Sequence, residues 1–208
     1  RKSTKKPKLI CASSSSVYGD SEKFPLREDM HTDSPVSLYA ATKKSNEVIA
    51  HSYSKLYELD ITCLRFFTVY GEYGRPDMAY YNFTKSILEG SEINRFNNGK
   101  VERDFTYVQD IVNPILRLIN MDTAPVKEKF RIFNIGNGNP IKLNNFIEIL
   151  EKECGKKAIC KDVPMQPGDV KKTYADVANL ENFVGYKPKT DIKYGLRRFV
   201  EWYKSYHG

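Results

Sequence analysis

A strand, a long helix and a second strand follow one another near the start of the chain, and this order limits the possible folds more than any other feature. Residues 8–16 open on an apolar run, and residues 60–67 are almost continuously apolar or β-forming. Between them, residues 37–59 repeat apolar side chains at helical spacing. Buried parallel strands show such continuous runs, and a helix is their usual crossover. The sequence therefore predicts a βαβ unit within an α/β fold.

The rest of the chain alternates helices with short strands. We expect helices that end before Gly90 and that cover 110–121, 143–154, 176–184 and 192–206, with strands over 130–135 and 158–163. Two further short strands, 92–96 and 103–108, flank an Asn-Asn-Gly sequence at 97–99, which is typical of a β-hairpin. Gly136 and Gly138 follow a strand, but no third glycine comes in register, so they indicate a turn.

Composition and charge narrow the class of protein. Of the 208 residues 40% are hydrophobic, enough for a sizeable core, but no apolar run approaches the roughly 18 residues of a membrane-spanning helix. We therefore expect no membrane insertion. The net charge of +7 either reflects a lysine-rich composition or indicates an anionic partner. Because the basic residues are scattered outside 1–8 and form no recognised nucleic-acid fold, a phosphorylated small molecule is expected rather than nucleic acid.

The cysteines and histidines do not form metal-binding patterns. Four cysteines (Cys11, Cys63, Cys154 and Cys160) make no Cys-x-x-Cys pair, and the three histidines lie far apart in the sequence. We expect no metal site. Reduced, buried cysteines that serve only in packing are typical of a cytoplasmic protein, which is the predicted location.

A possible proton-transfer set follows the first strand. The strand ends in the four hydroxyl residues of 13–16, and Tyr39 and Lys43 would share one face of the next helix. An ammonium beside a phenol favours the phenolate, which can take a proton from a substrate hydroxyl. A serine could hold the same oxygen, although four serines can also be merely a strand end of small residues. Tyr81 and Lys85 have the same spacing but follow no such strand, and they are interpreted as a pair on a helix surface.

Seven motifs taken together resemble the extended short-chain dehydrogenases/reductases, and within them the UDP-glucuronate 4-epimerases. The similarity runs in order over residues 8–205. Its motifs are ASSSSVYG at 12–19, YAATKKSNE at 39–47, RFFTVYG at 65–71, GRPDMA at 74–79, RDFTYV at 103–108, FNIG at 133–136 and MQPGDV at 165–170. The resemblance implies the C-terminal part of a Rossmann-like doubly wound parallel sheet plus a smaller α/β substrate-binding domain.

The resemblance also implies domain limits and a partner. Residues 1–75 would be the remaining part of an NAD-binding domain, and residues 76–208 would mainly bind the nucleotide-sugar. Within the second part, 108–136 would return to the Rossmann sheet. A homodimer through the helix at 37–59 is a further expectation.

By the same resemblance, the chemistry is NAD-dependent epimerisation of a UDP-sugar through a transient 4-keto intermediate. Tyr39 would take the proton from the 4-hydroxyl as bound NAD accepts the hydride from C4. Lys43 would hydrogen-bond the nicotinamide ribose, and Phe66 would lie against the nicotinamide. Ser14 would contact the reacting oxygen.

The other residues that the resemblance assigns would bind the substrate, which is expected to be UDP-glucuronate or UDP-galacturonate. Ser15 and Ser16 would line the sugar. The related 4,6-dehydratases resemble this sequence but carry Asp-Glu at these two positions, and the decarboxylases carry a Glu at the position of Ser16, so the two hydroxyls favour epimerisation. Thr68 and Arg75 would bind the carboxylate, and Arg103 would bind the diphosphate. Asn94 and Phe96 would contact the uracil, and Asp169 would bind the nucleotide. Simpler interpretations stay open: Arg75 as a surface residue, Arg103 as a partner of Glu102 or Asp104, Phe96 as core and Asp169 as a turn residue.

One departure from the family concerns the cofactor. No glycine-rich dinucleotide loop occurs in the 208 residues, and about 110 residues of the family's first half have no counterpart. We expect a fragment of a longer enzyme that is inactive alone. Two alternatives remain: another chain supplies the first half, or the chain is a non-catalytic nucleotide-sugar binding remnant.

Overall fold

The predicted βαβ unit is present in the computed structural model, which describes residues 6–165 and 169–208. It consists of β1 (Lys8–Ser14), α1 (Leu38–Tyr57) and β2 (Asp60–Phe66). β1 pairs with β2 and β2 with β6 (Phe130–Ile135), both in parallel, which gives the order β1-β2-β6. The prediction of an α/β fold with a parallel sheet is therefore confirmed.

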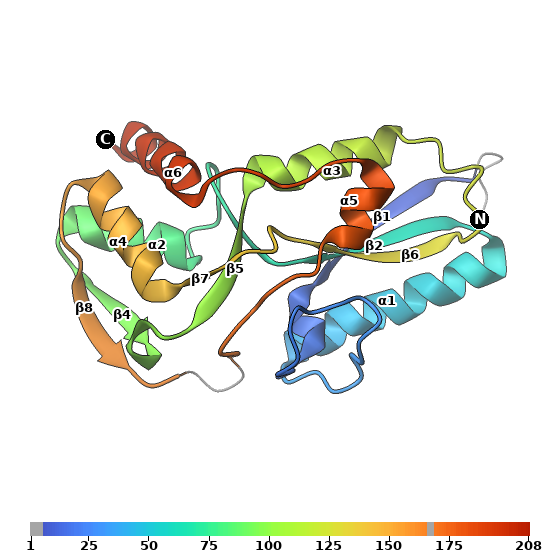
Figure 1. Ribbon diagram of the computed structural model, residues 1–208, viewed down its shortest axis with the longest axis horizontal. Coiled ribbons are helices and arrows are strands. Elements are labelled where there is room, and N and C mark those ends of the chain that lie inside the picture. The colour runs from blue at the N-terminus through green and yellow to red at the C-terminus, as the bar shows by residue number, and fades with distance from the viewer. Residues whose placement is uncertain (1–5, 166–168) are drawn as a thin grey trace.

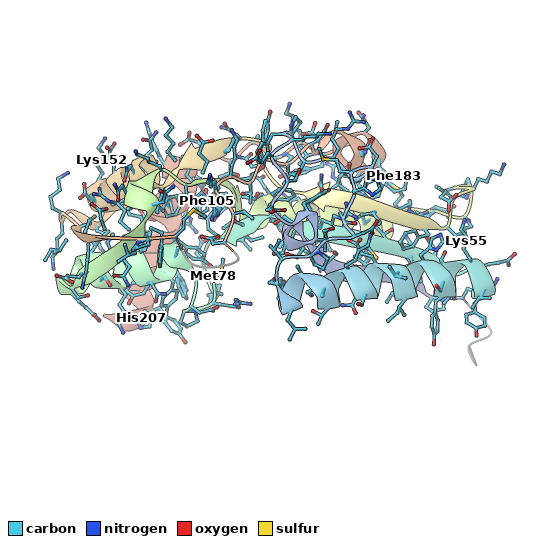
Figure 2. All side chains as sticks on the ribbon, turned by 90° about the horizontal axis from the view of Figure 1, so that it is seen from below. Lys55, Met78, Phe105, Lys152, Phe183 and His207 are labelled. Carbon is cyan, nitrogen blue, oxygen red and sulfur yellow. The ribbon has the colours of Figure 1, made fainter. Side chains whose placement is uncertain are left out.

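Helices cover both faces of this sheet (Figure 1). The alternation of side chains along β2 explains the arrangement. Ile61 and Cys63 pack with Ala50 of α1 on one face, whereas Leu64 packs on the other face with α3 (Val108–Asn120) and α5 (Ala178–Val184). Figure 2 places Lys55 of α1 and Phe183 of α5 on different sides of the strands. β2 is thus buried on both faces, as its apolar sequence predicts.

A second lobe contains the largest hydrophobic cluster. Three helices surround it: α2 (Ala79–Glu89), α4 (Leu143–Cys154) and α6 (Ile192–His207). At its centre the rings of Phe105 and Phe146 stack with centroids 4.1 Å apart (Figure 2 labels Phe105). Between the two lobes, β3 (Thr68–Tyr70), β5 (Glu102–Tyr107) and β7 (Pro140–Lys142) form a second sheet (Figure 1).

The predicted hairpin at 92–108 is wrong. β4 (Glu92–Phe96) pairs in parallel with β8 (Ile159–Val163), while β5 pairs with β3 and β7. Between β4 and β5 the chain forms the short 3₁₀ turn η2 (Asn97–Gly99), in which all three residues have positive φ. The Asn-Gly signal predicted the turn, but the partners of both strands lie far away in the sequence.

The interpretation of Tyr81 as a surface residue is also wrong. Its side chain is buried among aromatic rings of α6, including Phe199 and Tyr203, and its hydroxyl lies 2.6 Å from Nε2 of His207. Lys85 remains exposed. Helical spacing alone did not reveal that α6 covers this part of α2.

The cysteines are free, as predicted, but only two of them are buried. Cys63 and Cys154 lie in the core, and Cys11 and Cys160 are half-buried. Among the residues that the structure describes, no helix combines the length and apolar character needed to cross a membrane. α1 exposes large apolar side chains such as Leu38 and Leu56, but the homodimer through this helix stays a prediction.

Candidate active site

The serine sequence forms a sharp turn at the carboxyl end of β1. The strand ends at Ser14, two residues earlier than predicted, and Ser15–Tyr18 forms the 3₁₀ turn η1. The Oγ of Ser14 accepts a hydrogen bond from the Ser16 backbone N–H at 3.2 Å and donates to Ser16 Oγ at 3.1 Å. The turn brings Ser15 and Ser16 to a cavity of about 180 Å³ that Thr68, Arg103 and Asp169 also line.

Gly19 joins this turn to the segment that enters α1. Its φ of 62° lies in the left-handed region, and a Cβ there would lie 2.8 Å from the carbonyl oxygen of Ser34. Ser37, three residues after Ser34, caps α1 by accepting a hydrogen bond from the Ala40 backbone N–H. Glycine at this position therefore lets the serine turn and the beginning of α1 lie in contact.

Tyr39 and Lys43 lie one turn apart near the beginning of α1. Tyr39 is 55% exposed, and the Nζ of Lys43 lies 5.6 Å from its ring centroid. The same Nζ donates a hydrogen bond to the Ala12 carbonyl of β1 at 2.9 Å. A cavity of about 390 Å³ is lined by Tyr39 together with Ser14, Phe66 and Arg75. The cavity thus contains a phenol and a serine hydroxyl, and an ammonium lies beside the phenol ring, a combination of groups able to move a proton.

A second tyrosine near the serines has a different environment. Tyr18 is 5% exposed, its hydroxyl donates to Oδ1 of Asn134 at 2.6 Å, and Arg65 lies 4.8 Å above its ring. Burial raises the pKa of Tyr18 to about 12. Tyr18 therefore donates a structural hydrogen bond inside the protein, whereas the Tyr39 side chain is exposed.

The other predicted substrate residues gather around a large cavity of about 730 Å³. Its lining includes Thr68, Asn94, Phe96, Arg103 and Asp169. Arg103 donates from Nη2 to Oδ1 of Asp169 at 2.6 Å, across 66 residues of sequence. Arg103 also donates from Nη1 to the backbone oxygen of Glu102 at 2.9 Å. The carboxylates of its sequence neighbours Glu102 and Asp104 therefore do not bind it. The sequence had not linked Arg103 to Asp169.

Arg75 lines the cavity of Tyr39 but is bound elsewhere. Its Nε and Nη2 donate to the two carboxylate oxygens of Asp77 at 3.1 and 2.7 Å, and its side chain is 75% exposed. An ion pair so exposed to water is weak. Arg75 can therefore exchange Asp77 for another carboxylate at little cost.

Two buried acids were not recognised as important from the sequence. Asp104 is fully buried and accepts backbone hydrogen bonds from Asn137, Gly138 and Ala175 at 2.9 to 3.0 Å. Burial raises the pKa of its carboxyl, and these three N–H donors act in the opposite direction. Asp104 thus joins β5 to the Gly136–Gly138 bend, which was predicted as a turn. The second acid, Glu47, binds Arg65. The sequence signal for this pair was Arg65 itself, a charged residue within a strand predicted to be buried, which needs a partner of opposite charge.

Known proteins resemble this chain in sequence and in fold. A family model described as "NAD dependent epimerase/dehydratase family" matches residues 1–136. An uncharacterized protein of Methanocaldococcus jannaschii is 55% identical over 196 residues, 94% of this chain and 59% of that protein. UDP-glucuronate 4-epimerase 1 of Arabidopsis thaliana is 47% identical over 214 residues, 97% of this chain and 50% of that protein.

The structural comparison confirms the Rossmann-like α/β fold. The crystal structure of UDP-glucuronic acid 4-epimerase from Bacillus cereus in complex with UDP-glucuronic acid and NAD has a TM-score of 0.88 and 33% identity. The match covers 96% of this chain and 62% of that one. The chain thus spans 50 to 62% of the length of these three proteins.

Proposed function

Because this chain belongs to the NAD dependent epimerase/dehydratase family, we propose that it provides the substrate side of an enzyme that inverts C4 of a UDP-sugar. The proposed substrate is UDP-glucuronate, with UDP-galacturonate as the product. The main support is the shared cavity of Ser14 and Tyr39, beside which Lys43 places its ammonium. The names of the related proteins agree with this substrate.

The residues around the Tyr39 cavity fit one end of NAD. Phe66, which lines this cavity, would lie against the nicotinamide ring, and Lys43 would leave the Ala12 carbonyl to hydrogen-bond a ribose hydroxyl. The pyrophosphate and adenosine would need residues outside this sequence, since the 208 residues contain no glycine-rich dinucleotide loop. When bound, NAD would supply the reversible oxidation of the sugar C4 carbon.

In the proposed reaction, this chain handles the proton of the 4-hydroxyl. Tyr39, as phenolate, accepts that proton, and the Lys43 ammonium stabilises the negative oxygen. Ser14 donates a hydrogen bond to the same substrate oxygen and so fixes its direction. After the 4-keto sugar has rotated and presents its other face, Tyr39 returns the proton to the C4 oxygen.

The nucleotide and diphosphate would lie across the two adjoining cavities that share Thr68, Arg103 and Asp169, and the sugar would reach from there to the Tyr39 cavity. Arg103 would bind the diphosphate, while Asn94 and Phe96 would meet the uracil. Ser15 and Ser16 offer hydroxyls rather than acids to the sugar, so no side chain there assists loss of water. Arg75 would take the uronate carboxylate with its two parallel donors once it leaves Asp77.

The test is turnover by the longest reading frame that contains these 208 residues. Incubation with UDP-glucuronate should give UDP-galacturonate, observed as a new anomeric proton signal by NMR. No conversion of any UDP-sugar would contradict the proposal.

The absence of a glycine-rich loop from these residues favours one alternative, a non-catalytic domain that binds nucleotide-sugars. Such a domain would bind UDP in calorimetry but would show neither turnover nor the absorbance of a retained nicotinamide cofactor.

A further inference from the structure

A buried ion pair lies directly behind the serine turn. It joins Glu47 of α1 to Arg65 of β2, and both side chains are 2% exposed. Arg65 donates from Nε to Oε1 at 2.8 Å and from Nη2 to Oε2 at 2.9 Å. Such a two-point contact fixes orientation as well as distance. α1 and β2 are therefore held in one relative position at this level.

The same carboxylate also holds β1. Ser13 donates from Oγ to Oε1 of Glu47 at 2.6 Å, while the residue before it, Ala12, accepts the hydrogen bond of Lys43. Lys43 and Glu47 are four residues apart and so share a face of α1. Two neighbouring side chains of α1 thus bind two consecutive residues of β1, immediately before Ser14.

Arg65 is itself held on its other sides. The ring of Tyr18 lies 4.8 Å from its guanidinium carbon, and its Nη1 donates to the backbone oxygen of Glu28 at 3.3 Å. Both oxygens of Glu47 accept hydrogen bonds from Arg65, and the ammonium of Lys43, one turn away, binds elsewhere. Lys43 remains bound to a neutral carbonyl and close to the ring of Tyr39.

We propose that Ser13, Glu47 and Arg65 are positioning residues that set α1 along β1, and thereby the distance between the Ser14 hydroxyl and the Tyr39 phenol. None of the three lines the cavities assigned to substrate and nicotinamide. They act through Ser14, Tyr39 and Lys43 and do not touch the substrate. The inference rests on the proposed function of those three residues.

Ser13→Ala is the sharpest test, because it removes the link between Glu47 and β1 and leaves the ion pair in place. A matched control is Ser54→Ala. Like Ser13, Ser54 is a buried serine, but it belongs to α1. It donates to the Leu59 carbonyl at 2.7 Å, at the far end of the helix. Both variants lose one buried hydroxyl hydrogen bond, but only Ser13 lies beside the site.

We expect Ser13→Ala to lower kcat by roughly ten- to a hundredfold, the size of effect that a small misplacement of reacting groups can produce. KM should stay within about twofold of the wild type, because the substrate contacts are unchanged. Ser13→Cys, which keeps the size and a weak S–H donor, should restore part of kcat. Ser54→Ala should retain the wild-type kcat.

Four results would overturn the inference. An unchanged kcat in Ser13→Ala, or an equal loss in Ser54→Ala, would show that the contact has no special effect on the site. A rise in KM alone would assign Ser13 to substrate binding instead. A wild-type protein without turnover would first contradict the proposed function, and this inference would fail with it.

Discussion

The two sides of the candidate site are held in different ways. Behind Ser14 and Tyr39, the charges of Glu47 and Arg65 are fully buried and bind each other. On the other side, Arg75 binds Asp77 at the surface, with side chains 75 and 66% exposed, and Arg103 binds Asp169 at a cavity wall, with side chains 16 and 37% exposed. One side keeps its charges fixed inside the protein, and the other offers them to solvent.

This difference separates two tasks. A buried charge cannot easily exchange its partner, because it would remain without solvation during the exchange. A surface arginine can replace one carboxylate by a diphosphate or a uronate, since water stabilises it in between. The sheet side therefore suits the fixed geometry of proton transfer, and the open side suits the binding and release of an anionic substrate. The following variants test this division.

The largest expected effect is that of Tyr39→Phe. Loss of the proton acceptor should lower kcat by about 10²- to 10⁴-fold, the usual contribution of general acid–base catalysis. The affinity for UDP-glucuronate, measured by calorimetry, should remain unchanged because the ring stays. Turnover close to the wild-type rate would remove Tyr39 from the mechanism.

Removal of Arg65 should affect stability most. Arg65→Met leaves the carboxylate of Glu47 buried without its partner and should lower the free energy of unfolding by about 3–5 kcal/mol in urea denaturation. The double variant Glu47→Met, Arg65→Met should recover much of this loss. The surface pair of Arg95 and Asp162 provides the control, and Arg95→Met should change stability only slightly. Equal losses at both sites would contradict the contrast between buried and open pairs.

Arg103→Gln should act on binding rather than on turnover. Hydrogen bonds to charged groups contribute about 1.5–3 kcal/mol, so the KM for a UDP-sugar should rise by at least roughly tenfold while kcat changes little. Arg95→Gln is the matched control, because Arg95 lies on β4, the preceding strand in the sequence, and lines neither of the two cavities that Arg103 lines. A fall in kcat at constant KM would place Arg103 among the groups that position the reaction.

The smallest effect concerns the choice of sugar. Arg75→Leu should lower kcat/KM for UDP-glucuronate by about tenfold relative to UDP-glucose, because only the uronate carries a carboxylate for the guanidinium. Competition between the two sugars in one assay would measure this ratio directly. A wild-type preference for the neutral sugar would contradict the role proposed for Arg75.

The sequence predicted the elements that local patterns determine. Apolar runs placed β1, β2 and β6, and the spacing of Tyr39 and Lys43 placed both on one helix beside the serine turn. Partners distant in sequence were not predictable in this way. The pairing of β4 with β8, the contact of Arg103 with Asp169 and the burial of Tyr81 under α6 all depend on segments more than 60 residues away. The pair of Glu47 and Arg65 was missed because charged side chains are usually exposed.

Gly19 illustrates how far the requirements of such a site reach. Its backbone N–H closes the serine turn by donating to the Ser16 carbonyl, and a Cβ there would collide with the carbonyl oxygen of Ser34 and push apart the serine turn and the segment that leads to Tyr39. A residue of any other type would have to adopt a left-handed backbone as well. The backbone geometry alone therefore disfavours every substitution at this position. A library of random variants selected only for activity should return glycine at position 19 as consistently as it returns tyrosine at position 39.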